Sequence, residues 1–153
     1  MKHFSFTEFE RSVIATKYAI DNRIPDKLKN NVAALVDNVL DPLREAWGGP
    51  IDVSSGYRCP ELNDNPEIKG SKTSQHMTGQ AADLRIYVRD SKGKYVRDKN
   101  GHCIVDKAAN RRLFQMILDL RLPFDQLIDE SNFSWVHVSY RADGKNRHQT
   151  LKL

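Results

Sequence analysis

The sequence lacks the features that would place it outside the ordinary globular class. No apolar run approaches the roughly 20 residues that a membrane-spanning helix needs, so we expect no membrane partner. The first residues, Met1–Glu8, lack the apolar core and small-residue cleavage site of a secretory signal peptide. We therefore expect the protein to be cytoplasmic as synthesised.

Cysteine is scarce, since the chain contains only Cys59 and Cys103. Two cysteines cannot form a disulfide framework, and a reducing cytoplasm would keep both as thiols. Neither belongs to a C-x-x-C pair, so we do not expect cysteine to bind a metal.

A strong charge imbalance is also missing, because the net charge is only +4. This value is compatible with an anionic partner such as nucleic acid or bacterial cell wall. However, the basic residues are scattered, and no Arg/Lys run is interleaved with aromatic residues as a nucleic-acid surface requires. We expect a solvated surface of mixed charge and no nucleic-acid partner.

The length of 153 residues matches one domain, and neither an internal repeat nor an interdomain linker is present. We expect a single domain over residues 1–153, acting as a monomer. Helical spacing of apolar residues predicts helices from about 6 to 20, from 26 to 47 with a disturbance at Pro42, and from 107 to 120. Alternation predicts strands near 51–55, 80–88, 125–129, 135–141 and 149–153. This order, without a repeated βαβ unit, predicts an α+β fold with a mostly antiparallel sheet.

Two segments present polar side chains that suit a metal site. In the strand around His137, Val136 and Val138 share the face that suits a core, so His137 points toward a cleft. By the same alternation Asp83 lies on a polar face of its strand, and Gly79 allows the loop carrying His76 to fold back toward it. Each residue alone has an ordinary structural interpretation. Together they offer two imidazoles and one carboxylate, the ligand set of a catalytic zinc with an open position for water.

The motifs that carry these residues have a family resemblance. The motif S-x-H-x-x-G-x-A-x-D at 74–83 and the later W-V-H-V at 135–138 resemble the zinc-binding signature of the D-alanyl-D-alanine carboxypeptidase family of metallopeptidases, in a phage-associated branch. This family shares its fold with the hedgehog signalling domain. The resemblance runs from Phe6 to about Tyr140 and includes three further segments in the right order: 41–45, 53–58 and 124–128.

The resemblance implies a hedgehog/DD-peptidase-like fold and zinc held by His76, Asp83 and His137. It implies hydrolysis of a peptide bond in peptidoglycan stem peptides, of the D-Ala-D-Ala carboxypeptidase or L-Ala-D-Glu endopeptidase type. Arg58 matches the family arginine that holds the substrate carbonyl or carboxylate, a task that suits a planar guanidinium. Ser74 matches a family serine that hydrogen-bonds substrate. The structural alternatives are a surface salt bridge for Arg58 and a turn-shaping role for Ser74.

The general base is the point at which the sequence departs from the family. Many relatives carry Glu or Asp three residues before the last histidine, whereas this chain has Ser134, which cannot take a proton at neutral pH. The nearest carboxylates are Asp129 and Glu130, and alternation places them on opposite faces. We favour Glu130, because an acidic residue follows this strand in the phage-associated branch, with Asp129 as the alternative.

Two interpretations of the biological role remain open. A wall-degrading enzyme without a signal sequence suggests a phage or prophage product, acting as an endolysin or as part of a virion. Alternatively, the chain is a zinc-containing binding or virion structural module that has lost catalysis, which Ser134 at the expected base position favours.

Overall fold

The N-terminal region folds as two short helices. The structure, a computed structural model, describes residues 1–153. Helix α1 spans Phe6–Glu10 and begins with a capping pair, in which the backbone N–H of Ser5 donates to Glu8. Helix α2 spans Val13–Lys17. The prediction of one continuous helix to residue 20 is wrong, because the Ser12 side chain accepts from the Ala15 N–H and starts a new helix.

A long, interrupted helical segment follows and supplies most of the apolar core. It consists of α3 (Asp26–Leu35), a π-helical turn η1 (Val36–Leu40) and α4 (Asp41–Trp47), which ends at Gly48 in the left-handed conformation. The widened turn lies just before Pro42 and includes a bond from the Asp41 N–H to the Val36 carbonyl. The predicted disturbance is confirmed, since a widened turn relieves the clash that proline causes in a regular helix.

The sheet has five strands in the order β1-β2-β4-β3-β5. Their bounds are β1 Asp52–Ser55, β2 Ala81–Arg85, β3 Gln126–Glu130, β4 Trp135–Ser139 and β5 Gln149–Lys152. All neighbouring pairs are antiparallel except β3 and β5, which are parallel. The fold is therefore α+β, as predicted, with a mixed sheet that is mostly antiparallel.

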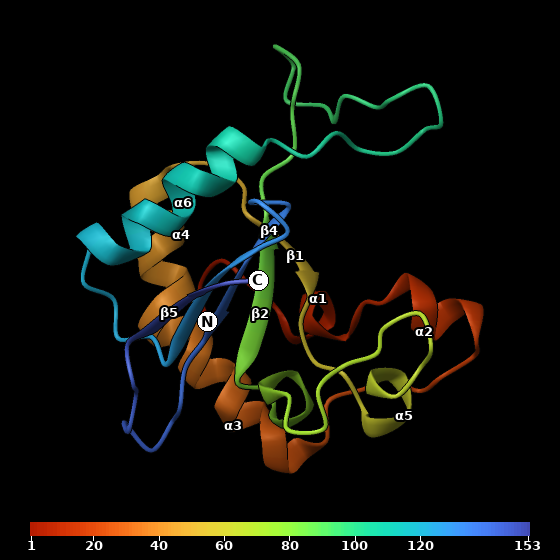
Figure 1. The fold of residues 1–153 in the computed structure, drawn as a ribbon, viewed down its shortest axis with the longest axis vertical. Helices are drawn as coiled ribbons and strands as arrows, with labels where there is room; N and C mark the ends of the chain where they lie inside the picture. The colour runs from red at the N-terminus through yellow and green to blue at the C-terminus, as the bar shows by residue number, and fades with distance from the viewer.

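The two faces of the sheet have different roles. Helices α3 and α4, together with α6 (Lys107–Asp119), cover one face (Figure 1). The buried core there contains the side chains that alternation assigned inward, including Leu84, Val136 and Val138. The opposite face carries the polar side chains of β2, β3 and β4. Two short helices, α5 (Pro60–Asn63) and the 3-10 helix η2 (Gln75–Thr78), lie within the segment that joins β1 to β2.

Residues 86–106 leave the body of the molecule between β2 and α6 and form an extended arm (Figure 1). Isolated bridges, such as Tyr87 with Val105 and Arg97 with Cys103, connect its two sides. A turn forms its first tip, where the Gly93 N–H donates to the Asp90 carbonyl. None of the helices has the length and apolar content to cross a membrane.

Candidate metal centre

Pairing of β2 with β4 places Asp83 directly opposite His137. Both side chains project from the polar face of the sheet, and Nδ1 of His137 lies 2.9 Å from Oδ1 of Asp83. The same row of the sheet continues through Ile128 of β3 to Leu151 of β5. All four residues line one open cleft of about 1020 Å³, so this row forms part of the floor of the cleft.

His76 reaches the same point from helix η2. The hydroxyl of Ser74 accepts from the His76 backbone N–H and starts this helix, and Gly79 ends it with φ 69°. A side chain at Gly79 would meet Val32 on α3, so glycine allows η2 to pack closely there. Nε2 of His76 lies 3.3 Å from both Oδ1 of Asp83 and Nδ1 of His137.

A backbone carbonyl sets the orientation of the His76 ring. Nδ1 of His76 lies 2.6 Å from the carbonyl oxygen of Gly56, which can only accept a hydrogen bond. Nδ1 therefore carries the proton, and the lone pair of Nε2 faces Asp83 and His137. Outer contacts of this kind fix the tautomer and orientation of metal-binding histidines.

The three side chains fit a zinc ion. Ligand atoms from His76, Asp83 and His137 all lie within 4.8 Å of one another. Tetrahedral bonds of roughly 2.0–2.1 Å separate ligand atoms by about 3.3 Å, close to the 2.9 and 3.3 Å found here. The set of two nitrogens and one oxygen is typical of catalytic zinc sites, which leave one position to water or substrate.

Electrostatics keep these groups in the protonation states that a cation needs. Burial lowers the pKa of His76, which favours the neutral imidazole. Burial alone would raise the pKa of Asp83, but the charges and hydrogen bonds of His76 and His137 outweigh it and hold this pKa well below the usual range. Asp83 therefore presents a carboxylate charge, and His76 a neutral imidazole.

Arg58 lies beside this cluster with much of its hydrogen-bonding capacity unused. Its backbone N–H donates to the His76 carbonyl, which places the side chain at the edge of the His–Asp–His cluster. One guanidinium nitrogen lies 3.7 Å from Oδ2 of Asp83, and Nε is buried without a hydrogen-bond partner. The side chain also lines the cleft, beside the carboxylate of Asp83.

The two candidate bases occupy different environments. Glu130 lines the cleft, and burial followed by the nearby charge of Asp83 raises its pKa. Asp129 is buried on the other side of β3 and accepts a hydrogen bond from the Phe133 N–H. It thus holds the turn between β3 and β4, while the Ser134 hydroxyl donates to the Ser131 carbonyl.

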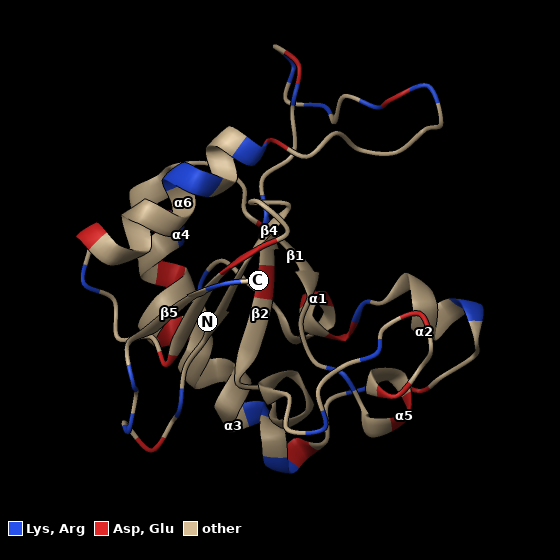
Figure 2. Cartoon of the chain, in the orientation of Figure 1, with Lys and Arg blue, Asp and Glu red and all other residues tan.

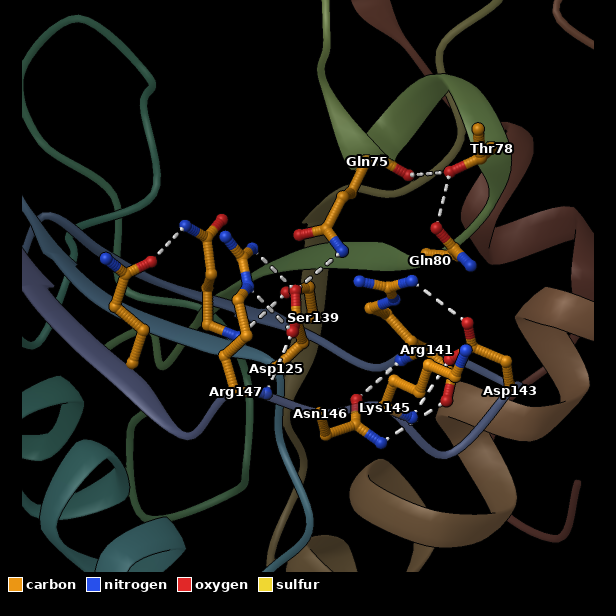
Figure 3. Close-up of polar contacts among 12 residues, drawn as sticks. Gln75, Thr78, Gln80, Asp125, Ser139, Arg141, Asp143, Lys145, Asn146 and Arg147 are labelled. Atoms are coloured by element: carbon orange, nitrogen blue, oxygen red, sulfur yellow. Dashed lines mark hydrogen bonds and ion pairs between the residues drawn. The ribbon is translucent and has the colours of Figure 1, made fainter.

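Sequence reasoning missed a second group of residues next to the metal cluster. Asp125 is fully buried and accepts from the Gln75 amide at 2.9 Å and from the Arg147 guanidinium at 2.8 and 3.0 Å. Figure 3 shows Gln75 of η2 and Arg147 converging on this carboxylate. Asp125 therefore connects the segment before β5 to the helix that carries His76. One indication of Asp125 was present in the sequence, because this residue lies in the segment 124–128 that resembles the family.

An open polar cleft with a His–Asp–His cluster on its floor is the arrangement of a metal-dependent hydrolase. A sequence model of the family described as Peptidase M15 matches residues 2–104, about two thirds of the chain. The chain therefore belongs to this family of zinc-dependent peptidases. The matched region contains His76 and Asp83 but ends before His137. His137 is placed beside them by the pairing of β4 with β2. The comparison with curated proteins gives no match.

Proposed function

We propose that this protein is a zinc peptidase that hydrolyses a peptide bond in the stem peptides of bacterial peptidoglycan. Its bond specificity would be of the D-Ala-D-Ala carboxypeptidase or L-Ala-D-Glu endopeptidase type. The observation that carries the proposal is the convergence of His76, Asp83 and His137 on the floor of an open cleft of about 1020 Å³. Membership of the peptidase family supports the reaction class.

The proposed ligands are Nε2 of His76, Nδ1 of His137 and the carboxylate of Asp83. When bound there, zinc would polarise the carbonyl group of the substrate and lower the pKa of a bound water. Glu130 is the proposed general base, because its carboxylate borders the cleft and its raised pKa suits proton uptake and release. It takes a proton from the attacking water and returns it to the nitrogen of the departing amine as the C–N bond breaks.

Arg58 and Ser74 are proposed to bind the substrate. Arg58 lines the cleft, and its guanidinium can donate to the carbonyl oxygen as negative charge develops on it. Ser74 lines the same cleft, and its hydroxyl accepts from the His76 N–H. Its own proton remains available for a substrate carbonyl, so capping η2 and binding substrate are compatible roles.

Mass spectrometry of digested peptidoglycan tests the proposal. The zinc-loaded protein should release either free D-alanine or peptides with a new N-terminal glutamate, and a chelator should abolish either product. Addition of zinc after removal of the chelator should restore it. Intact peptidoglycan after prolonged digestion by protein of verified zinc content would contradict the proposal.

The second candidate function is a zinc-containing binding or structural module without catalysis. Ser134 at the expected position of the base favours it, since its hydroxyl is engaged with the Ser131 carbonyl. Loss of turbidity of outer-membrane-permeabilised cells separates the two functions. A catalyst lowers turbidity in a chelator-sensitive manner, whereas a binding module leaves it unchanged at any dose.

A further inference from the structure

Charge is distributed unevenly along the chain. Residues 86–112, the arm and the first half of α6, contain eight of the 24 Lys and Arg and three of the 20 Asp and Glu. This segment carries a net charge of +5, and the other 126 residues together carry −1. Figure 2 shows the basic residues along the arm and at the start of α6.

The arm contributes no side chain to the buried core. No residue from Arg85 to Ala108 is buried, and the large apolar side chains Tyr95 and Ile104 are each 38% exposed. Its root is nevertheless held in place, because the Tyr95 hydroxyl donates to Asp52 and the Arg89 guanidinium stacks 4.0 Å from the Tyr95 ring. Ile86, at the root, packs against the core, and no other residue of the arm does. A segment of this length with so few core contacts adds little to stability, so a binding role accounts for it better.

The cations of this surface are free to bind an external anion. Of the eight Lys and Arg of the segment only Arg89 forms an ion pair, and seven form none: Lys92, Lys94, Arg97, Lys99, Lys107, Arg111 and Arg112. The last three border a shallow depression of about 480 Å³ whose lining includes no acidic side chain. In such a hollow, several side chains can donate hydrogen bonds to one phosphate group at once.

The catalytic cleft is a separate region, since no residue between Asp83 and Asp125 lines it. Binding at the arm would therefore leave the metal cluster accessible to a peptide. Together these observations favour an attachment surface that works alongside the catalytic site.

We propose that the arm and the first half of α6 form an attachment surface for a phosphate-bearing anionic polymer of the bacterial cell wall. The identity of this polymer rests on the proposed function, which brings the enzyme to the wall. Lysines on an extended arm are flexible point charges, which suit a polymer of repeating phosphates. The Tyr87 and Tyr95 rings pack edge-to-face against each other, so they are not free to stack on bases as a nucleic-acid surface requires.

Sedimentation with purified cell walls tests this inference in the presence of a chelator, so that no cleavage occurs. Walls that retain their phosphodiester-linked polymers should bind the protein, and walls stripped of these polymers by hydrofluoric acid should not. Replacing Lys92, Lys94 and Lys99 by glutamine should weaken binding at least about tenfold. It should also reduce the slope of log K against log salt by about 2 to 3, as expected when three phosphate contacts are lost.

A matched control replaces three unpaired lysines outside the surface: Lys27, Lys145 and Lys152. This variant should bind walls like the wild type, although its net charge changes equally. The arm variant should still cleave a soluble stem peptide. Because sedimentation is measured without cleavage, a failure of the proposed function would leave the wall-binding result valid. Equal binding to stripped and unstripped walls, equal loss in both variants, or tighter binding to duplex DNA than to walls would overturn the inference.

Discussion

Gly56 and Phe9 touch backbone to backbone. A Cβ atom at Gly56 would lie 2.6 Å from Cα of Phe9 and 2.8 Å from its carbonyl oxygen. The Tyr57 N–H donates to this same carbonyl at 2.8 Å. The N-terminal helix α1 therefore fixes the turn after β1, and the carbonyl of Gly56 in that turn orients His76. A residue at the start of the chain is in this way connected to the metal cluster through two backbone contacts.

This relationship predicts that Gly56→Ala weakens both the fold and the zinc site. The added methyl group meets backbone atoms that cannot move aside, so unfolding should become easier by about 1–3 kcal/mol. Displacement of the carbonyl should also lower zinc affinity roughly 10- to 100-fold. Chemical denaturation and competition with a chromogenic chelator measure the two effects. Gly49→Ala is the control, because its Cβ would meet only ordinary contacts at 3.7 Å.

Asp83→Asn should abolish zinc binding and hydrolysis while keeping side-chain volume. Zinc affinity should fall more than about a hundredfold, since even outer contacts of a metal site cost 10- to 100-fold. Elemental analysis after dialysis measures the bound zinc. Asp64→Asn, at an exposed carboxylate without hydrogen bonds, should retain a full equivalent. Full zinc retention by the Asp83 variant would remove this carboxylate from the ligand set.

Arg58→Ala should keep zinc and lose activity. A donor directed at the developing oxyanion contributes roughly 3–4 kcal/mol, so kcat should fall several hundredfold. Arg58→Lys should recover only part of this loss, since an ammonium cannot reproduce the fork of the guanidinium. Wild-type cleavage of peptidoglycan by the alanine variant would show that Arg58 has no role in the transition state. Arg23→Ala, at an exposed ion pair with Asp21, serves as the control.

Glu130→Gln should retain zinc and lower kcat/KM by about 10²- to 10⁴-fold. Because burial raises the pKa of Glu130, the wild-type rate should fall on the acid side as pH drops through a value above 4.5. This acid limb should be missing from the glutamine variant. Asp129→Asn should instead lower stability, because it loses the hydrogen bond to the β3–β4 turn, and should keep the limb. Loss of the acid limb in Asp129→Asn and its retention in Glu130→Gln would instead make Asp129 the general base.

Asp125 should make stability depend on pH in the acid range. Its hydrogen bonds to Arg147 hold its pKa at about 2, below the ordinary value of about 3.9 for an aspartate. The folded state therefore gains stability that is complete above the unfolded pKa and is lost as pH falls through about 2. The shift corresponds to about 2 kcal/mol. Asp125→Asn should be less stable than wild type at neutral pH by about this amount and equal to it near pH 2. Denaturation curves across this range measure it, and a pH-independent difference would contradict it.

The local features of the fold could be read from the chain itself. Pro42 predicted the disturbed helix, apolar spacing predicted α6, and the alternation around residues 82–84 and 136–138 predicted the core face of the sheet. The single predicted helix over residues 6–20 failed because a serine side chain can end one helix and start another within two residues.

Ligand types and the strand faces they occupy followed from the sequence, because side-chain chemistry and a period of two are local properties. Register is not local: only tertiary pairing decided that Asp83 stands opposite His137 and that η2 brings His76 to both. The same holds for Gly56 and Asp125, since a backbone carbonyl and a buried ion pair acquire their neighbours only when distant parts of the chain pack together.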